Sequence, residues 1–155
     1  MSRAAVGWAW VAGQALLLGA LIFVPGRSDW SQPLLVTIPA SVLFFGGFVV
    51  VAVAALRLGS ALTPTPVPND RGALSTSGLY RFVRHPIYTG VLAVVVALVL
   101  RSGSWLHLIV GLITVVFFDR KAAWEERRLV ERYPDYPEYA RRTPKFVPLP
   151  VSGSH

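Results

Sequence analysis

The chain has 155 residues, which is enough for one domain. Hydrophobic residues make up 54% of it and charged residues 15%, against roughly 45–50% and about 25% in soluble domains, so the composition indicates a membrane protein. The absence of cysteine excludes disulfides, thiolate nucleophiles and thiolate metal ligands. The net charge of +7 fits nucleic acid or an anionic membrane surface. Because Lys and Arg gather on particular loops, we expect the bilayer as partner and no nucleic acid.

Two long uncharged stretches lie in the first third of the chain. Residues 6–24 and 34–56 contain 19 and 23 residues without a charge. Crossing a hydrocarbon core of ~30 Å takes about 20 residues in a helix, so each stretch predicts a transmembrane helix. Gly46 and Gly47, in the middle of the second stretch, predict a kink or a close contact with another helix.

The longest polar segment follows, from Arg57 to Pro86. Prolines occupy alternate positions between residues 63 and 68, which excludes a regular helix there. Residues 69–72 have the composition of a turn. We expect an ordered connector or a loop of the functional site in this segment.

Two shorter apolar runs complete the hydrophobic part of the chain. Residues 87–100 and 105–118 contain 14 residues each, about 21 Å of helix at ~1.5 Å per residue. They predict a hairpin of two short transmembrane helices, whose tyrosine and arginine flanks extend its reach. We expect the second helix to continue past Phe118 to Arg132, leaving the membrane, before Pro134 and Pro137 break it.

The distribution of positive charge predicts the orientation. Thirteen of the 15 Lys and Arg residues lie in the N-terminus, the second loop and the C-terminal segment, and only Arg27 and Arg101 lie in the other loops. The positive-inside rule therefore places both termini in the cytoplasm, and we expect the cell inner membrane. The predicted fold is an all-α integral membrane protein in which residues 1–155 form one domain with four transmembrane helices, the last two a short hairpin, and a cytoplasmic C-terminal segment.

A cluster of ionisable residues lies between Gly78 and Gly90, at the start of the third apolar run. His85 directly precedes Pro86, and because proline is tolerated in the first turn, a helix is predicted to begin there. A helix N-terminus beside Arg81, Arg84 and His85 should hold a carboxylate or phosphate well. The alternative is a turn before a helix with arginines at the membrane interface.

A second cluster, around Glu125 and Glu126, follows the fourth apolar run. A solvated helix face is one interpretation, because Glu125 and Arg128 are ordinary helical neighbours. We expect instead that this carboxylate pair faces the arginine–histidine turn and holds a zwitterion or a cation. Tyr88 and Trp124 could add aromatic faces for a cationic centre.

Four other residues are interpreted without a catalytic role. His107 lies inside an apolar run and is expected to be a satisfied helix–helix contact. Tyr133, Tyr136 and Tyr139 recur among prolines and are expected to anchor the C-terminal segment at the membrane interface.

We expect no metal site, because no second histidine lies at a ligand spacing from His85. The sequence contains neither a dinucleotide-binding glycine motif nor a P-loop.

Four motifs in the second half of the chain follow the order found in one known family: residues 74–90 with R-H-P-x-Y-x-G, residues 125–129 with E-E-x-x-L, the pair Tyr136 and Tyr139, and residues 145–148. They resemble the isoprenylcysteine carboxyl methyltransferase family, which is related to the phospholipid N-methyltransferases. The resemblance covers about residues 69–148, the expected catalytic half. Tyr133-Pro134 departs from the phenylalanine–glycine pair that many members have.

The resemblance implies an enzyme that uses S-adenosyl-L-methionine, enclosed by the hairpin and the C-terminal segment. Its acceptor would be lipophilic: a prenylcysteine-type carboxylate, a lipid amine, or a small thiol or acid at the cytoplasmic face. Glu126 would be catalytic, with Arg141 and Arg142 on the substrate side. The implied cofactor-binding residues are Gly78, Tyr80, Arg84, His85, Pro86, Tyr88, Gly90, Glu125 and Glu126.

Two other functions stay open from the sequence. A membrane reductase that uses NADPH is one, because membrane sterol reductases are similar in their C-terminal arrangement. A non-catalytic membrane module is the other. Against a transport function, the ionisable residues gather at one membrane face, and only His107 lies within a span.

Overall fold

The computed structural model describes residues 2–26, 29–59 and 74–148, and all regular structure in these ranges is helical. The prediction of an all-α fold is therefore confirmed for this part of the chain. The alternating prolines and the turn at residues 69–72 lie outside the described residues. The elements in chain order are α1 (Arg3–Phe23), α2 (Leu34–Leu58), the short 3₁₀ helix η2 (Gly78–Arg81), α3 (Pro86–Ser102), α4 (Trp105–Arg132) and α5 (Tyr136–Arg142).

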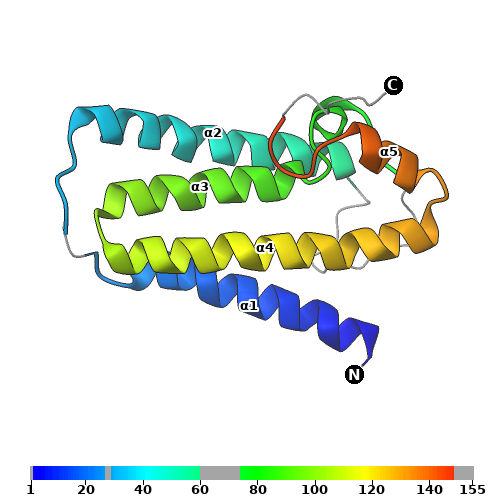
Figure 1. Cartoon of the computed structure of the whole chain (residues 1–155), viewed down its shortest axis with the longest axis horizontal. Helices are drawn as coiled ribbons and strands as arrows, with labels where there is room; N and C mark the ends of the chain where they lie inside the picture. The colour runs from blue at the N-terminus through cyan, green and yellow to red at the C-terminus, as the bar shows by residue number, and fades with distance from the viewer. Residues whose placement is uncertain (1, 27–28, 60–73, 149–155) are drawn as a thin grey trace.

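The four long helices run alongside one another, with α3 between α2 and α4 and with α1 against α4 (Figure 1). The start of α1, the end of α4 and the short helix α5 lie at the same end of the molecule (Figure 1). A small core of Leu21, Val95 and Val99 joins α1 to α3. The opposite end holds the α1–α2 connection and the turn between α3 and α4.

Two helices, α1 and α2, are long and apolar enough to cross a membrane. They point large hydrophobic side chains outward: Leu35 is 88% exposed, Leu56 82% and Phe23 84%. An apolar surface of this extent is costly in water and fits the hydrocarbon core of a bilayer.

The hairpin of α3 and α4 follows the predicted boundaries closely. α3 begins at Pro86, as its fixed φ angle favours, and α4 continues to Arg132. α3 has 17 residues, about 26 Å at ~1.5 Å per residue, because the helix adds Pro86 before the apolar run and Arg101 and Ser102 after it. Gly103 ends α3 in the left-handed conformation with φ +59°.

The α1–α2 connection is hydrogen-bonded to the turn between α3 and α4. The carboxylate of Asp29 accepts a hydrogen bond from the backbone N–H of Trp105 at 2.9 Å, which satisfies a free donor of the first turn of α4. The backbone N–H of Asp29 donates to the Gly103 carbonyl at 2.7 Å. These bonds hold the end of the bundle farthest from α5.

Gly47 and Gly90 let α2 and α3 approach very closely. A Cβ atom on Gly47 would lie 2.6 Å from the Gly90 carbonyl oxygen and 2.8 Å from a methyl group of Val94. A Cβ atom on Gly90 would lie 2.6 Å from the Gly47 carbonyl oxygen. The prediction of a close helix contact from the Gly46-Gly47 pair is confirmed at Gly47, because small residues allow backbones to meet.

The segment after α4 differs from the sequence-based expectation. α4 ends before Pro134 and Pro137, as expected, but a further helix follows. Pro137 occupies the first turn of α5, where its missing N–H needs no partner. Tyr136 is 2% exposed, and the hydroxyl of Tyr139 donates to the Tyr80 carbonyl at 2.5 Å. The prediction that Tyr136 anchors the tail at the membrane interface is therefore wrong, because this side chain packs inside the protein. For Tyr139, which is only partly buried, it stays a prediction.

His107 is buried near the α1–α2 connection, at the end opposite α5. A Cβ atom on Gly26 would lie 3.8 Å from its imidazole ring. Its Nδ1 has no hydrogen-bond partner among the described residues. The prediction of a satisfied helix–helix contact is therefore wrong for this nitrogen.

Replacing Gly47 by Ala should lower the free energy of unfolding by about 1–3 kcal/mol, because the methyl group overpacks the α2–α3 contact. Gly46→Ala is the matched control, since nothing lies within 4 Å of its added Cβ and alanine is the better helix former. Thermal unfolding in detergent, followed by circular dichroism, compares the two variants. Equal unfolding temperatures would contradict the close contact.

Candidate active site

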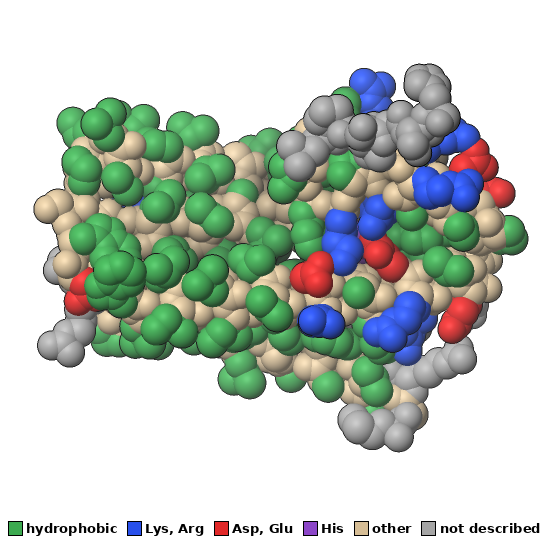
Figure 2. All heavy atoms as spheres, in the orientation of Figure 1, with side chains coloured by type: hydrophobic (Ala, Val, Ile, Leu, Met, Phe, Trp, Pro, Cys, Tyr) green, Lys and Arg blue, Asp and Glu red, His purple; other side chains and the backbone are tan. Residues whose placement is uncertain are grey.

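Ionisable side chains gather at the end of the molecule where α5 lies (Figure 2). In that view, most Lys, Arg, Asp and Glu side chains lie over this end, while hydrophobic side chains cover most of the remaining surface. The two clusters predicted from the sequence meet here. We call Arg84, His85, Tyr88, Glu125 and Glu126 the polar cluster.

Arg84 lies just before α3 and reaches two other segments, α4 and the end of α5. Its Nε donates to Glu126 Oε1 at 2.8 Å, and the two side chains are 14% and 18% exposed. Its Nη1 donates to the carbonyl oxygens of Ala140 at 2.7 Å and Thr143 at 2.6 Å. A charge this well shielded needs such partners, so Arg84 ties α4 and α5 to the start of α3.

The imidazole of His85 lies between the two carboxylates. Its Nε2 donates to Glu126 Oε1 at 3.0 Å, and its Nδ1 lies 3.8 Å from Glu125 Oε2. The hydroxyl of Tyr88 donates to Glu125 Oε2 at 2.8 Å. Both carboxylates therefore face α3, and the interpretation of Glu125 and Glu126 as a plain solvated helix face is wrong.

The Glu126 carboxyl is held in its ionised form. Burial by itself raises its pKa, but the hydrogen bonds from His85 and Arg84, together with their charges, outweigh burial and lower the pKa to about 2. Glu126 is therefore an acceptor of hydrogen bonds at neutral pH. It is not placed to donate a proton.

The segment after α5 lies across the start of α3. The backbone N–H groups of Arg84 and His85 donate to the carbonyls of Pro144 at 2.9 Å and Lys145 at 3.2 Å. The Thr89 hydroxyl donates to the Phe146 carbonyl at 2.8 Å. This backbone pairing places the C-terminal segment directly over the polar cluster.

Two aromatic rings considered for a cationic ligand already have neighbours. The Tyr88 ring is stacked parallel to the His85 ring, with centroids 5.3 Å apart, and the Lys121 ammonium lies 5.2 Å from its centroid. The Arg128 guanidinium lies 3.1 Å from the centroid of Trp124. The protein's own cations thus occupy positions at both rings.

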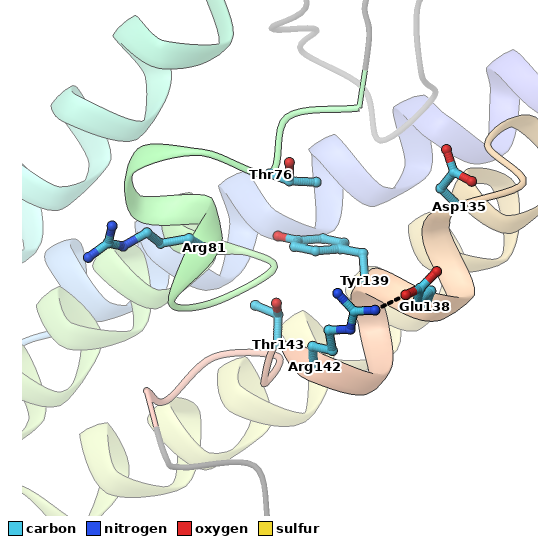
Figure 3. Close-up of a pocket in the computed structure, with 7 residues that line it drawn as sticks. All are labelled: Thr76, Arg81, Asp135, Glu138, Tyr139, Arg142 and Thr143. Atoms are coloured by element: carbon cyan, nitrogen blue, oxygen red, sulfur yellow. Dashed lines mark ion pairs between the residues drawn. The ribbon is translucent and has the colours of Figure 1, made fainter. Parts of the chain in front are cut away.

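A cavity of about 320 Å³ lies between the segment around η2 and α5 (Figure 3). Seven residues line it: Thr76, Arg81, Asp135, Glu138, Tyr139, Arg142 and Thr143. It does not include His85 or the Glu125–Glu126 pair, but it adjoins the polar cluster at Thr143, whose carbonyl accepts a hydrogen bond from Arg84.

Tyr139 crosses this cavity in Figure 3. Burial raises its pKa, which the Arg84 charge partly offsets, to about 12, so its hydroxyl keeps the proton that it donates to Tyr80. Of the two arginines predicted on the substrate side, Arg142 lines the cavity and forms an ion pair with Glu138. Arg141 is exposed and does not line it.

The remaining residues predicted to bind the cofactor serve the backbone conformation or the packing of the protein. Gly78 has φ +61°, a left-handed conformation that favours glycine, and starts η2. Tyr80 is buried, and Pro86 begins α3. Gly90 packs against α2 at Gly47, a contact that accounts for glycine there without a ligand, and its role in cofactor binding stays a prediction.

Sequence reasoning missed Lys121 and Gln14. Lys121 lies on α4, is 3% exposed and donates to Gln14 Oε1 of α1 at 2.5 Å. A signal was present, because Gln14 is the one residue with a polar amide in the first apolar run, and polar residues within spans usually face the bundle interior. Within the described ranges, no group of three or more His, Asp or Glu side chains is placed to hold a metal ion.

Comparison with known proteins places this geometry in context. Residues 35–136 match the family described as phospholipid methyltransferase. The chain is 32% identical over 143 residues to the cobalt-zinc-cadmium resistance protein CzcN of Cupriavidus metallidurans, covering 90% of this chain and 62% of that protein. It therefore spans about three fifths of the length of this relative.

Two relatives named as methyltransferases match shorter regions. Methanethiol S-methyltransferase 1 of Bradyrhizobium diazoefficiens is 38% identical over 72 residues, 45% of this chain and 24% of that protein. Protein-S-isoprenylcysteine O-methyltransferase of Schizosaccharomyces pombe is 32% identical over 83 residues, 52% of this chain and 35% of that protein. The resemblance inferred from the motifs is confirmed.

The Glu126 pKa predicts how stability depends on pH. Because its pKa of about 2 in the folded protein lies below the ordinary 4.5, ionised Glu126 stabilises the fold fully above pH 4.5, and this contribution is lost as the pH falls toward 2. Glu126→Gln has no such group, so its unfolding temperature should fall less over this range than that of the wild type. Glu138→Gln, in an exposed ion pair, should behave like the wild type. Parallel curves for wild type and Glu126→Gln would contradict the assignment.

Proposed function

Because the chain belongs to the phospholipid methyltransferase family, we propose that it transfers a methyl group from S-adenosyl-L-methionine to a lipophilic acceptor at the cytoplasmic face of the membrane. The observation that supports this most is the polar cluster, in which Arg84 and His85 meet Glu125 and Glu126 beside apolar helices. Such a cluster is costly at the edge of a membrane unless it is used.

We propose a topology with four spans, formed by α1, α2, α3 and the first half of α4. The exposed apolar faces of α1 and α2 support it. The gathering of the start of α1, the end of α4 and α5 at one end of the molecule supports a common cytoplasmic side. The polar cluster would then lie at the cytoplasmic interface of the inner membrane.

The polar cluster fits the charged end of the proposed cofactor. Glu125 is 25% exposed and hydrogen-bonded to the neutral hydroxyl of Tyr88, so its charge is less fully matched than that of Glu126. A carboxylate in this state can accept from an ammonium group. The adjoining cavity of about 320 Å³ is within the size range of small-molecule sites, roughly 300–1,000 Å³.

The chain's own residues would bind, orient and exclude water. His85, Glu125 and Glu126 would hold the cofactor's amino-acid end, with Tyr88 beside them. When bound, the cofactor supplies a methyl group on a positively charged sulfur. Displacement at that carbon needs alignment of the two reacting atoms more than proton chemistry. Phe118 and Phe146, which pack near Tyr88 and His85, would keep water away from the reacting groups.

The acceptor class follows the names of the family and the relatives. The family is described as acting on phospholipids, and two relatives are named for a thiol and for a prenylated cysteine. We propose a lipophilic acceptor of one of these kinds. Arg142 lines the cavity beside α5 and is the better placed of the two predicted substrate-side arginines.

Binding of S-adenosylhomocysteine to detergent-purified protein tests the proposal. We expect saturable binding by calorimetry, weakened roughly 10- to 100-fold in His85→Ala, as for the loss of a hydrogen bond to a charged group. His107→Ala is the matched control, because His107 lies at the other end of α4, and circular dichroism checks that both variants are folded.

Wild-type protein that is folded but does not bind S-adenosylhomocysteine would contradict the methyltransferase proposal. Saturable binding of NADPH in the same titration would then favour the reductase function. Binding of neither ligand would favour a non-catalytic membrane module.

A further inference from the structure

Lys121 is the most completely buried charged side chain beside the polar cluster. It is 3% exposed, and its ammonium lies 5.2 Å from the ring centroid of Tyr88 and 5.8 Å from that of Phe118. Tyr88 in turn donates to Glu125. The ring of Tyr88 therefore lies between the Lys121 ammonium and Glu125, one of the residues proposed to hold the cofactor.

The partners of this ammonium are neutral. It donates to the amide oxygen of Gln14 at 2.5 Å and otherwise faces the two aromatic rings. In the part of the chain that the structure describes, no carboxylate lies within ion-pair distance of it, and Glu125 acts on it through longer-range attraction. A buried cation without an anionic partner is costly.

The other lysine of the chain shows the contrast. Lys145 is 24% exposed and forms an ion pair with Asp119 at 2.7 Å. The more buried lysine thus has the weaker partner. An anion brought to the Lys121 ammonium would supply the charged partner that Gln14 does not.

The amide oxygen of Gln14 is the hydrogen-bond acceptor that an anion at Lys121 would have to replace. Gln14 lies on α1, a helix whose apolar stretch is only 11% buried inside the protein, so one helix separates Lys121 from the surrounding lipid. The Gln14–Lys121 hydrogen bond joins α1 to α4. A lipophilic molecule entering beside α1 would have to replace a single neutral acceptor.

We propose that Lys121 binds the anionic group of a lipophilic acceptor, a carboxylate or a thiolate, in exchange for the amide of Gln14, so that the site selects anionic acceptors over amines. This rests on the proposed methyl transfer. A lysine ammonium orients a carboxylate as a point charge, and it also favours the ionised form of a thiol.

Charge and electrons balance in the transfer that this residue serves. The acceptor's anionic oxygen or sulfur forms a bond to the methyl carbon, while the bond from that carbon to the sulfonium sulfur breaks and its electron pair stays on sulfur. Both products are neutral at the reacting atoms, and Lys121 keeps its protons. An amine acceptor would instead require a base to remove a proton, and a buried ammonium opposes that.

Three probes with the same alkyl chain test the binding step without the cofactor: dodecanoate, dodecanol and dodecylamine, titrated into full-length protein in a nonionic detergent. Wild type should bind dodecanoate more tightly than the other two. Lys121→Met should weaken dodecanoate binding roughly 10- to 100-fold, as expected for a hydrogen bond to a charged group, and should leave dodecanol unchanged. Lys121→Arg should restore most of the preference, because it keeps the charge.

Arg120→Met is the matched control, because it removes the same charge one residue away at an exposed position. It should bind all three probes like the wild type. Equal dodecanoate affinity in wild type and Lys121→Met would overturn the proposal, and so would an equal loss in Arg120→Met, which would indicate a general charge effect.

The variant Gln14→Leu tests whether the anion replaces Gln14 at Lys121 or whether the Gln14–Lys121 hydrogen bond only stabilises the fold. Because the amide competes with the anion for the ammonium, its removal should tighten dodecanoate binding several-fold. A structural bond predicts the opposite sign, a loss in Gln14→Leu like that in Lys121→Met, and that loss would overturn the exchange.

Turnover with S-adenosylmethionine distinguishes this proposal from the one on which it rests. Methylation of dodecanoate or dodecanethiol in preference to dodecylamine supports both proposals. Preferential methylation of the amine overturns the role of Lys121 while the methyltransferase proposal stands. Failure of the wild type to bind S-adenosylhomocysteine overturns the methyltransferase proposal and this one with it.

Discussion

The Arg84 guanidinium is the interaction on which the polar end of the protein depends. It donates to the Glu126 carboxylate and to two backbone carbonyls in and after α5, so one side chain joins three segments far apart in the sequence. Shielding two opposite charges from water costs free energy that their attraction alone does not always offset. Here the additional hydrogen bonds from His85 and to the two carbonyls complete the partners of both groups. Loss of Arg84 would therefore leave two carbonyls without this donor and the Glu126 carboxylate with only the hydrogen bond from His85.

The apolar helices provide the rigid support for this end. Gly47 and Gly90 bring the backbones of α2 and α3 into contact, and the paired loops at Asp29 and Gly103 hold the far ends of the helices together. The start of α3 is thereby held relative to α4, and it carries His85 and Tyr88 toward the two glutamates. Residues from rigid helices hold a site more precisely than residues from loops. The neighbouring α1 is joined to α4 by the Gln14–Lys121 bond and by the edge contact of Trp10 with Phe117.

Local patterns predicted the features that depend on local physics. Proline at the first helical position predicted the start of α3, and Pro134 and Pro137 predicted that α4 ends near Arg132. The opposite charges of the two clusters predicted that they would meet, and the structure pairs Arg84 with Glu126. The helix α5 was missed because it has only 7 residues and contains Pro137, so that its stability comes from packing of Tyr136 and not from its own propensity. Burial of Tyr136 was missed for a related reason, since a tyrosine suits a membrane interface and a protein interior equally well.

The sequence alone determined that the chain is helical and rich in lipid-compatible surface, that its ionisable residues would gather at one end, and that its motifs resemble a methyltransferase family. The first two conclusions follow from composition, the lengths of the uncharged runs and the placement of charge, and the third follows from the order of short motifs; all of these can be read along the chain. Only the tertiary structure decided which partner each charged group has. In it, Glu126 is hydrogen-bonded to Arg84 and His85, and Glu125 is hydrogen-bonded to Tyr88. Lys121 is hydrogen-bonded to a neutral amide on another helix. Ion pairing and burial depend on contacts between distant segments, and spacing along the chain does not specify those contacts.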